Sequence, residues 1–168
     1  FIEALDNSGM LMGTDIQGSY AETEVTNLTF DSRKVTPGTL FIAKGVHFKE
    51  EYLFSAIEKG AVAYISDRII AGREKYIAVN DIRAAMALVS RMFYCDPQTD
   101  LTTFAVTGTK GKTTTSYYLK EILDTYAADT STRECGFMST IDTYDGIERF
   151  ESTNTTPESP DVWRHFHN

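Results

Sequence analysis

The sequence predicts an α/β protein organised as two units, and three observations support this. Short, fully apolar segments alternate with segments of helical spacing, which favours a mostly parallel sheet covered by helices. A polar stretch containing a proline, residues 95–100, interrupts the alternation. A glycine loop then lies between a strand-like and a helix-like segment. We therefore expect one domain at 1–98 and the beginning of a second α/β domain, again with a mostly parallel sheet, at 99–168.

Periodicity and capping residues define the elements expected in the first domain. Strands are predicted at 25–30, 39–43, 61–66 and 76–79, and helices at 50–59 and from 81 to about 94. Gly60 is well placed to end the first helix, because glycine tolerates the left-handed backbone of a C-terminal cap. Asn80 or Asp81 can cap the start of the second helix with a side-chain oxygen.

The second domain begins with a predicted strand at 101–107 and a helix from 112 to about 126. A strand at 136–141 follows, and Asp145-Gly146 predicts a hairpin turn into a short strand at 148–150. Ser159 is expected to cap a last helix that has Pro160 at its first position. The helix after the glycine loop carries an apolar stripe, which we expect to pack against the sheet: Tyr117, Tyr118, Leu119, Ile122, Leu123 and Tyr126.

Composition limits the classes of function. Aspartate and glutamate number 24 against 16 lysines and arginines, a net charge of −8, which argues against a general nucleic-acid binder. No apolar run approaches the about 18 residues that a membrane span needs, and no signal peptide is recognisable. Cys95 and Cys135 form no ligand cluster, which is typical of reduced thiols. These features predict a cytoplasmic protein that is not inserted into a membrane.

The glycine loop is the most informative motif. Gly108 and Gly111 let the backbone curl so that several N–H groups point at one anion, and the following helix adds its positive N-terminal end. Lys112 can reach terminal phosphates, and Thr113 offers a hydroxyl to Mg²⁺. The match to the general phosphate-loop motif is partial, because Val106 stands where that motif has a glycine. A nucleoside triphosphate with Mg²⁺ is the expected ligand, and a plain glycine turn with a solvated lysine is the alternative.

Three motifs together resemble the Mur ligase family. Residues 106–114 are similar to the family's ATP loop, TGTNGKTT, with Lys110 in place of the usual asparagine. Residues 31–43 resemble the DSR…PG.LF.A signature of one branch, and residues 154–157 resemble the NTTP loop of the same branch. That branch, the UDP-N-acetylmuramyl-tripeptide synthetases, adds the third residue of the peptidoglycan stem peptide.

The resemblance implies roles for particular residues. It implies that Lys112 is the catalytic residue, that Thr113 is a ligand of Mg²⁺, and that ATP is bound by Gly108, Thr109, Lys110, Gly111, Lys112, Thr113 and Thr114. The N-terminal domain is expected to hold the uridine diphosphate portion of the substrate through Phe30 and Ser32. The muramyl dipeptide is expected to contact Asn154, Thr155 and Thr156, with His47 as a weaker candidate.

The implied reaction is ATP-dependent amide bond formation. An acyl phosphate forms on the D-glutamate carboxylate of UDP-N-acetylmuramyl-L-alanyl-D-glutamate, and an incoming amino group displaces phosphate, leaving ADP. Residues 48–53 and Lys110 resemble the lysine-adding synthetases of Gram-positive cocci, and this resemblance implies L-lysine rather than meso-diaminopimelate as the added amino acid. The strands of the second domain are too few to bury a parallel sheet on both faces, so we expect an N-terminal fragment that is inactive alone.

The remaining expectations concern partners and alternatives. The protein is expected to be a monomer whose partners are the two substrates. The first alternative is another Mur-superfamily ligase such as folylpolyglutamate synthase, against which the DSR domain argues. The second is a non-catalytic module that binds a nucleotide or a UDP-sugar.

Overall fold

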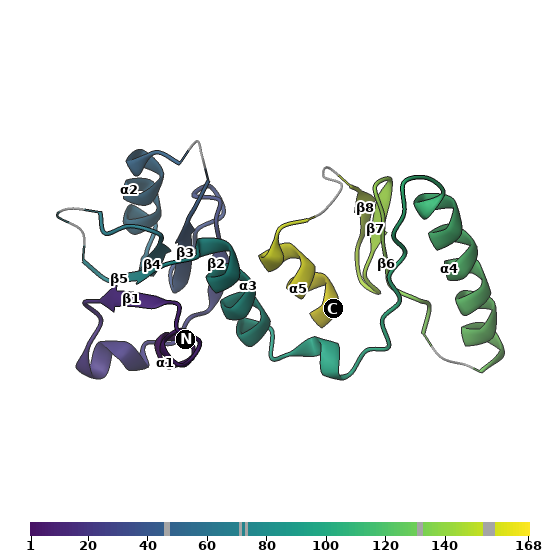
Figure 1. Ribbon diagram of the computed structural model, residues 1–168, viewed down its shortest axis with the longest axis horizontal. Helices are drawn as coiled ribbons and strands as arrows, with labels where there is room; N and C mark the ends of the chain where they lie inside the picture. The colour runs from purple at the N-terminus through teal and green to yellow at the C-terminus, as the bar shows by residue number, and fades with distance from the viewer. Residues whose placement is uncertain (46–47, 71, 73, 131–132, 153–156) are drawn as a thin grey trace. The chain divides into compact units, whose positions relative to one another are not determined.

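The computed structural model describes residues 1–168 except for 46–47, 71, 73, 131–132 and 153–156. The chain divides into two compact units, Phe1–Phe93 and Tyr94–Asn168, and each has its own sheet (Figure 1). This division falls a few residues before the boundary predicted from the polar stretch. The assignment of 1–98 and 99–168 as functional domains stays a prediction. In the described part of the chain, no helix is both long and apolar enough to cross a bilayer.

The first unit is a five-stranded sheet with helices on both faces. Its elements are α1 (Ile2–Asn7), β1 (Leu11–Thr14), the 3₁₀ helix η1 (Gly18–Glu22), β2 (Asn27–Thr29), β3 (Thr39–Ala43), α2 (Glu50–Glu58), β4 (Ala61–Ser66), β5 (Tyr76–Val79) and α3 (Ile82–Phe93). The strand order is β1-β5-β4-β3-β2. Strands β2 to β5 pair in parallel, and β1 pairs antiparallel with β5. The predicted α/β class with a mostly parallel sheet is confirmed.

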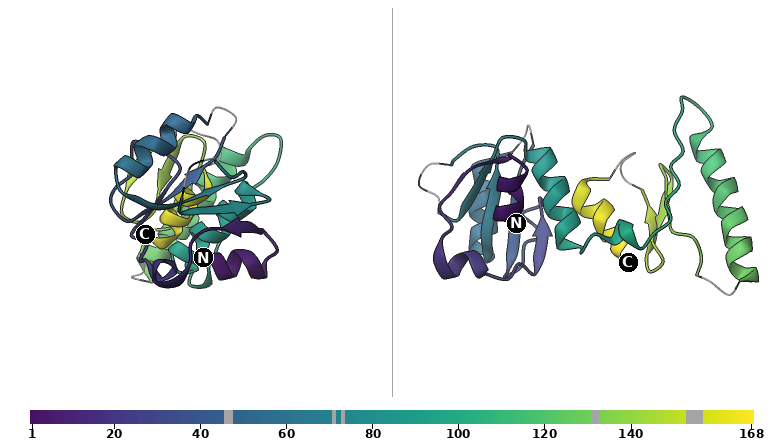
Figure 2. Two further views of the ribbon diagram at one scale, coloured as in Figure 1. Left: turned by 90° about the vertical axis from the view of Figure 1, so that its left-hand side faces the viewer. Right: turned by 60° about the horizontal axis from the view of Figure 1, so that its bottom comes forward.

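Alternation along the central strands creates two cores, because successive side chains of a strand point to opposite faces. Leu40 and Ile42 of β3 pack with α1 and α3 on one face of the sheet. Phe41 and Ala43 of the same strand pack with α2 on the other. The ribbons of α1 and α2 accordingly lie on opposite sides of this sheet (Figure 2). All five residues of β3 are buried, which is why this segment reads as a continuous apolar run in the sequence.

The predicted end of α2 and the predicted start of α3 are confirmed in detail. Gly60 follows α2 with a φ of +96°, and its N–H donates to the Ile57 carbonyl at 3.0 Å. Asp81 caps α3, because its Oδ1 accepts the N–H groups of Arg83 and Ala84 at 2.9 and 3.0 Å. Both devices satisfy backbone groups that have no partner within the helix itself.

The second unit combines helices with a three-stranded antiparallel sheet in the order β6-β7-β8. Its elements are the 3₁₀ helix η2 (Pro97–Thr99), α4 (Lys112–Asp129), β6 (Phe137–Met138), β7 (Asp142–Tyr144), β8 (Arg149–Glu151) and α5 (Ser159–His167). The predicted Asp145-Gly146 turn joins β7 to β8. The predicted strand at 136–141 is only partly formed, because β6 ends at Met138 and a turn follows.

The described sheet of the second unit is antiparallel, unlike the mostly parallel sheet predicted for it. Three further predictions for this unit are wrong. Residues 101–107 form no strand. A strand needs a hydrogen-bonded neighbour, and no described segment of this unit pairs with these residues. Half of the predicted apolar stripe of α4 is not packed, since Tyr118, Ile122 and Tyr126 are 65–69% exposed. Ser159 is the first residue of α5 rather than its cap; Glu158 holds the cap position and makes no side-chain capping bond.

Candidate nucleotide-binding site

The glycine loop is shaped by two backbone conformations that other residues rarely adopt. Gly108 has a φ of +149° and Gly111 a φ of +77°, and Gly111 is the N-terminal cap of α4. The first N–H groups of a helix have no intrahelical acceptor, and the helix dipole makes this end positive. The loop therefore leaves the positive N-terminal end of α4 facing solvent, where it is favourable for binding an anion.

Lys112 lies over the loop that precedes it. Its Nζ donates a 2.6 Å hydrogen bond to the carbonyl oxygen of Gly108. Thr109, Lys110 and Thr114 are exposed beside it. The lysine ammonium and the first N–H groups of α4 thus lie on one short segment. A polyphosphate bound there would compete with the Gly108 carbonyl for Lys112.

A turn that the sequence did not single out lies beside the loop. The hydroxyl of Thr113, in the first turn of α4, is 3.3 Å from the hydroxyl of Thr140, between β6 and β7. One helical turn further on, the Tyr117 hydroxyl donates to the carboxylate of Asp142, and this bond raises the pKa of Tyr117. The Tyr117 ring also packs edge-on against Phe137 with centroids 4.8 Å apart. These contacts join the start of α4 to the β6–β7 hairpin.

The oxygen atoms available here suit Mg²⁺ held mainly by a nucleotide. Mg²⁺ prefers hard oxygen ligands, keeps several waters and is commonly bound through substrate phosphates rather than an all-protein cage. Thr113 contributes a hydroxyl oxygen at the phosphate end of the loop. Over the described ranges, no group of three or more His, Cys, Asp or Glu side chains is arranged to hold a metal ion. The Thr113 hydroxyl is a hard oxygen of the kind that fits a cation carried by phosphates.

Phe30 and Ser32, the predicted uridine diphosphate residues, follow β2 in the first unit. The Nζ of Lys44 lies 4.8 Å from the centre of the Phe30 ring, and the Nζ of Lys59 donates to the Ser32 carbonyl at 2.8 Å. Two ammonium groups thus lie near the two predicted residues. Both groups carry the positive charge that a bound anion would need.

Arg33, beside Ser32, forms an ion pair with Asp31. Two guanidinium nitrogens donate to the carboxylate, the shorter bond being 2.7 Å, and the Asp31 carboxylate also accepts the Arg33 N–H at 2.9 Å. The hydrogen bond from Arg33 lowers the pKa of Asp31 to about 2. The Arg33 side chain is thus held in an intramolecular ion pair with Asp31.

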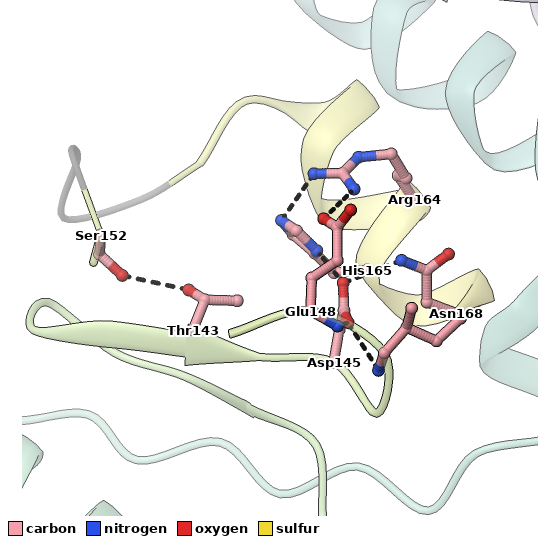
Figure 3. A network of polar contacts seen from close by, with 8 residues as sticks. Thr143, Asp145, Glu148, Ser152, Arg164, His165 and Asn168 are labelled. Carbon is pink, nitrogen blue, oxygen red and sulfur yellow. Dashed lines mark hydrogen bonds and ion pairs between the residues drawn. The ribbon is translucent and has the colours of Figure 1, made fainter. Parts of the chain in front are cut away.

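Four predicted substrate residues, His47, Asn154, Thr155 and Thr156, lie outside the described residues. In the sequence, the last three fall between the β7–β8 hairpin and α5. A buried polar network joins that hairpin to α5 (Figure 3). Asp145 Oδ2 accepts hydrogen bonds from His165 Nδ1 at 2.6 Å and from Asn168 Nδ2 at 2.9 Å. The sequence marked Asp145 only as a turn residue, so its pairing with His165 carried no sequence signal.

Burial and hydrogen bonding act in opposite directions on Asp145. Its side chain is 1% exposed, and burial alone disfavours the carboxylate. Hydrogen bonds from the Glu148 amide, His165, Asn168 and the Ile147 amide favour the ionised form and outweigh burial. The pKa of Asp145 therefore lies well below its usual range.

Comparisons with known proteins identify the class to which the chain belongs. Residues 106–168 match the model of the Mur ligase middle domain. The chain is 42% identical over 146 residues to the UDP-N-acetylmuramoyl-L-alanyl-D-glutamate--L-lysine ligase of Streptococcus pneumoniae, covering 86% of this chain and 29% of that protein. It is 46% identical over 142 residues to the UDP-N-acetylmuramyl-tripeptide synthetase of Ligilactobacillus salivarius, covering 82% and 27%.

A solved structure agrees with these relatives. The structure of a UDP-N-acetylmuramoyl-L-alanyl-D-glutamate--2,6-diaminopimelate ligase matches with a TM-score of 0.65 and 26% identity, over 93% of this chain and 31% of the other. The chain belongs to the Mur ligase family. Within that family it is similar to enzymes named as an L-lysine ligase of UDP-N-acetylmuramoyl-L-alanyl-D-glutamate or as a UDP-N-acetylmuramyl-tripeptide synthetase. It spans less than a third of the length of these curated relatives.

Proposed function

We propose that this chain is part of an ATP-dependent ligase that adds an amino acid to UDP-N-acetylmuramyl-L-alanyl-D-glutamate. The observation that carries the proposal is the loop from Gly108 to Thr113, whose glycines hold positive φ values at the start of α4. This loop lies within the region that matches the Mur ligase middle domain. The names of the similar proteins supply the substrate.

The proposal divides the substrates between the two units. ATP belongs to the second unit, with backbone N–H groups from Gly108 to Thr114 on its phosphates and Lys112 at the terminal phosphate. Thr113 would hold Mg²⁺, which when bound neutralises charge on the phosphates. The uridine diphosphate belongs to the first unit, with Phe30 and Ser32. The muramyl dipeptide belongs to Asn154, Thr155 and Thr156, and His47 stays a weaker candidate.

The chemistry explains why these groups are needed. Phosphoryl transfer to a carboxylate brings two anions together, and fixed positive groups offset their repulsion. Lys112 and the N-terminal end of α4 supply such charge in this chain. A uridine diphosphate handle far from the reacting carboxylate adds binding energy that orients the dipeptide. Lys44 and Lys59 lie near the residues assigned to that handle and supply charge of the right sign.

L-lysine is the proposed amino acid. The support is the 42% identity to a relative that is named for L-lysine. We further propose that the ligase works as a monomer in the cytoplasm. The 168-residue chain by itself is expected not to turn over, since it covers less than a third of its relatives.

The test is an assay of the full-length gene product. Release of ADP is measured with the UDP-muramyl dipeptide and L-lysine together, and with each omitted in turn. Release that needs both substrates supports the ligase. Binding of nucleotide without release under any combination would favour a non-catalytic module. Turnover with a folate substrate in place of the UDP-muramyl dipeptide would point to folylpolyglutamate synthase.

A further inference from the structure

Thr140 lies where it can act on the hydroxyl of Thr113, and we infer that it is a positioning residue for the cation that accompanies the nucleotide. The inference rests on the proposed function, which places Thr113 on Mg²⁺. Its structural basis is the 3.3 Å separation between the two hydroxyl oxygens, which belong to residues 27 positions apart. Thr140 and the loop residues Gly108 to Gly111 are all exposed.

The turn that carries Thr140 is held in one conformation by Ser139. The Ser139 hydroxyl accepts the N–H groups of Ile141 and Asp142 at 3.1 and 3.2 Å. The Ser139 N–H donates to the Asp142 carbonyl at 3.0 Å. Three hydrogen bonds therefore close the backbone around Thr140, so the position of its side chain is set by the turn.

A second set of contacts fixes this turn against α4. Tyr117 is four residues after Thr113, so the two side chains lie on the same face of the helix. Its hydroxyl donates to the Asp142 carboxylate, and its ring packs against Phe137. The hairpin is thus attached to α4 one turn beyond Thr113. This attachment places Thr140 beside Thr113 through structure that is separate from the glycine loop.

The chemistry of a hydroxyl ligand explains what Thr140 would contribute. A threonine hydroxyl has one proton and two lone pairs, and it binds a cation through a lone pair. Its proton must then point away from the cation, where it needs an acceptor. The Thr140 oxygen is a side-chain acceptor within reach. Thr140 would therefore hold the Thr113 hydroxyl in the orientation that offers a lone pair to the cation.

The test measures the affinity of ADP for the full-length protein by calorimetry, once with Mg²⁺ and once with EDTA. The wild type is expected to bind more tightly with Mg²⁺. Thr140→Val should reduce this Mg²⁺-dependent gain by roughly three- to tenfold, the effect of losing one modest hydrogen bond. Its affinity in EDTA should stay within about twofold of wild type, because phosphate binding by the loop does not need Thr140. Thr140→Ser keeps the hydroxyl and should restore the gain.

Thr125→Val is the matched control, because it makes the same substitution on α4, where the Thr125 hydroxyl bonds only to the Glu121 carbonyl in its own helix among the described contacts. It should leave both affinities unchanged. A wild type that gains nothing from Mg²⁺ would contradict the assignment of Thr113 in the proposed function. If Mg²⁺ increases the affinity for ADP equally in the wild type and in Thr140→Val, only the role of Thr140 is overturned. Equal weakening in Mg²⁺ and in EDTA would assign Thr140 a purely structural role and also overturn the inference.

Discussion

Nδ1 of His165 lies 2.6 Å from Oδ2 of Asp145, and the two side chains are only 3% and 1% exposed. The pair connects α5 to the turn between β7 and β8, as Figure 3 shows. The second oxygen of Asp145 accepts the N–H groups of Ile147 and Glu148, which closes that turn. One carboxylate therefore holds both the hairpin turn and the helix. This arrangement makes Asp145 a strong test of how the second unit is stabilised.

Asp145→Asn is expected to destabilise the protein by about 3 kcal/mol, because removing one member of a buried pair leaves its partner without compensation. Denaturant unfolding monitored by circular dichroism gives the free energy of unfolding. The control is Glu148→Gln, which breaks the 3.1 Å ion pair with Arg164 between the same two segments. That pair is exposed, so its loss should cost less than about 1 kcal/mol. An equal loss of unfolding free energy in the two variants would mean that the buried network stabilises the protein no more than the exposed ion pair does.

The same carboxylate predicts a pH dependence. The pKa of Asp145 is lower in the folded protein than in the unfolded chain, so the unfolded state binds more protons as pH falls. The stabilisation is complete at pH values above the pKa of aspartate in the unfolded chain, about 3.9, and it is lost as the pH falls towards the pKa of Asp145 in the folded protein. The stability difference between wild type and Asp145→Asn should therefore be largest at pH 5 and smaller at pH 3. Asp31 titrates equally in both proteins and cancels in this difference.

Gly60→Ala should destabilise the first unit by about 1–3 kcal/mol, because a non-glycine residue is strained in this conformation. Gly60 has a φ of +96°, and an added Cβ would lie 3.0 Å from the backbone Cα of Pro37. Chemical denaturation measures the loss. Gly13→Ala is the matched control, since nothing lies within 4 Å of its Cβ position and its φ is not left-handed. A comparable loss in both variants would indicate a general effect of replacing glycine.

The parts of the fold that the sequence predicted correctly depend on local patterns. Strand β3 reads as a continuous apolar run because both of its faces are covered, and Asp81 caps α3 through its own side chain. The error at 101–107 has a physical reason. Apolar composition indicates a preference for burial, but a strand also needs a paired neighbour, and the sequence does not show whether one is present. The exposed residues of α4, such as Tyr118, were mispredicted for the same reason.

The site was predictable only where one short segment contains it. Gly108 to Thr113 are consecutive, so residue types and spacing were enough to predict an anion-binding loop. Thr140 and Thr113 are far apart in sequence and meet only because a turn and a helix face are brought together. The pairing of Asp145 with His165 is likewise tertiary. Such contacts have no periodic or compositional signature.

Lys112→Ala should remove most of the activity of the full-length protein while leaving the affinity for the UDP-muramyl dipeptide nearly unchanged. Its ammonium is the charged side chain at the proposed terminal phosphate, and a charge-assisted contact in such a site is worth several kcal/mol. Turnover and substrate binding are measured separately. Lys49→Ala replaces an exposed lysine outside the loop and should behave as wild type. Near-normal turnover of Lys112→Ala would show that the loop does not bind the reacting nucleotide.

The amino acid added is expected to be L-lysine. Meso-diaminopimelate differs from lysine by one additional carboxylate, so a site for it needs a cationic partner, and arginine binds a carboxylate through two parallel hydrogen bonds. A site for lysine instead presents acidic groups to the free ammonium, and these would repel the second carboxylate. Competing the two amino acids in one assay of the full-length protein measures the ratio of their kcat/KM values. We expect a ratio of at least tenfold in favour of lysine, equivalent to about 1.4 kcal/mol. A preference for diaminopimelate would reverse the specificity proposed here while leaving the nucleotide site and the family unaffected, because neither depends on the side chain of the incoming amino acid.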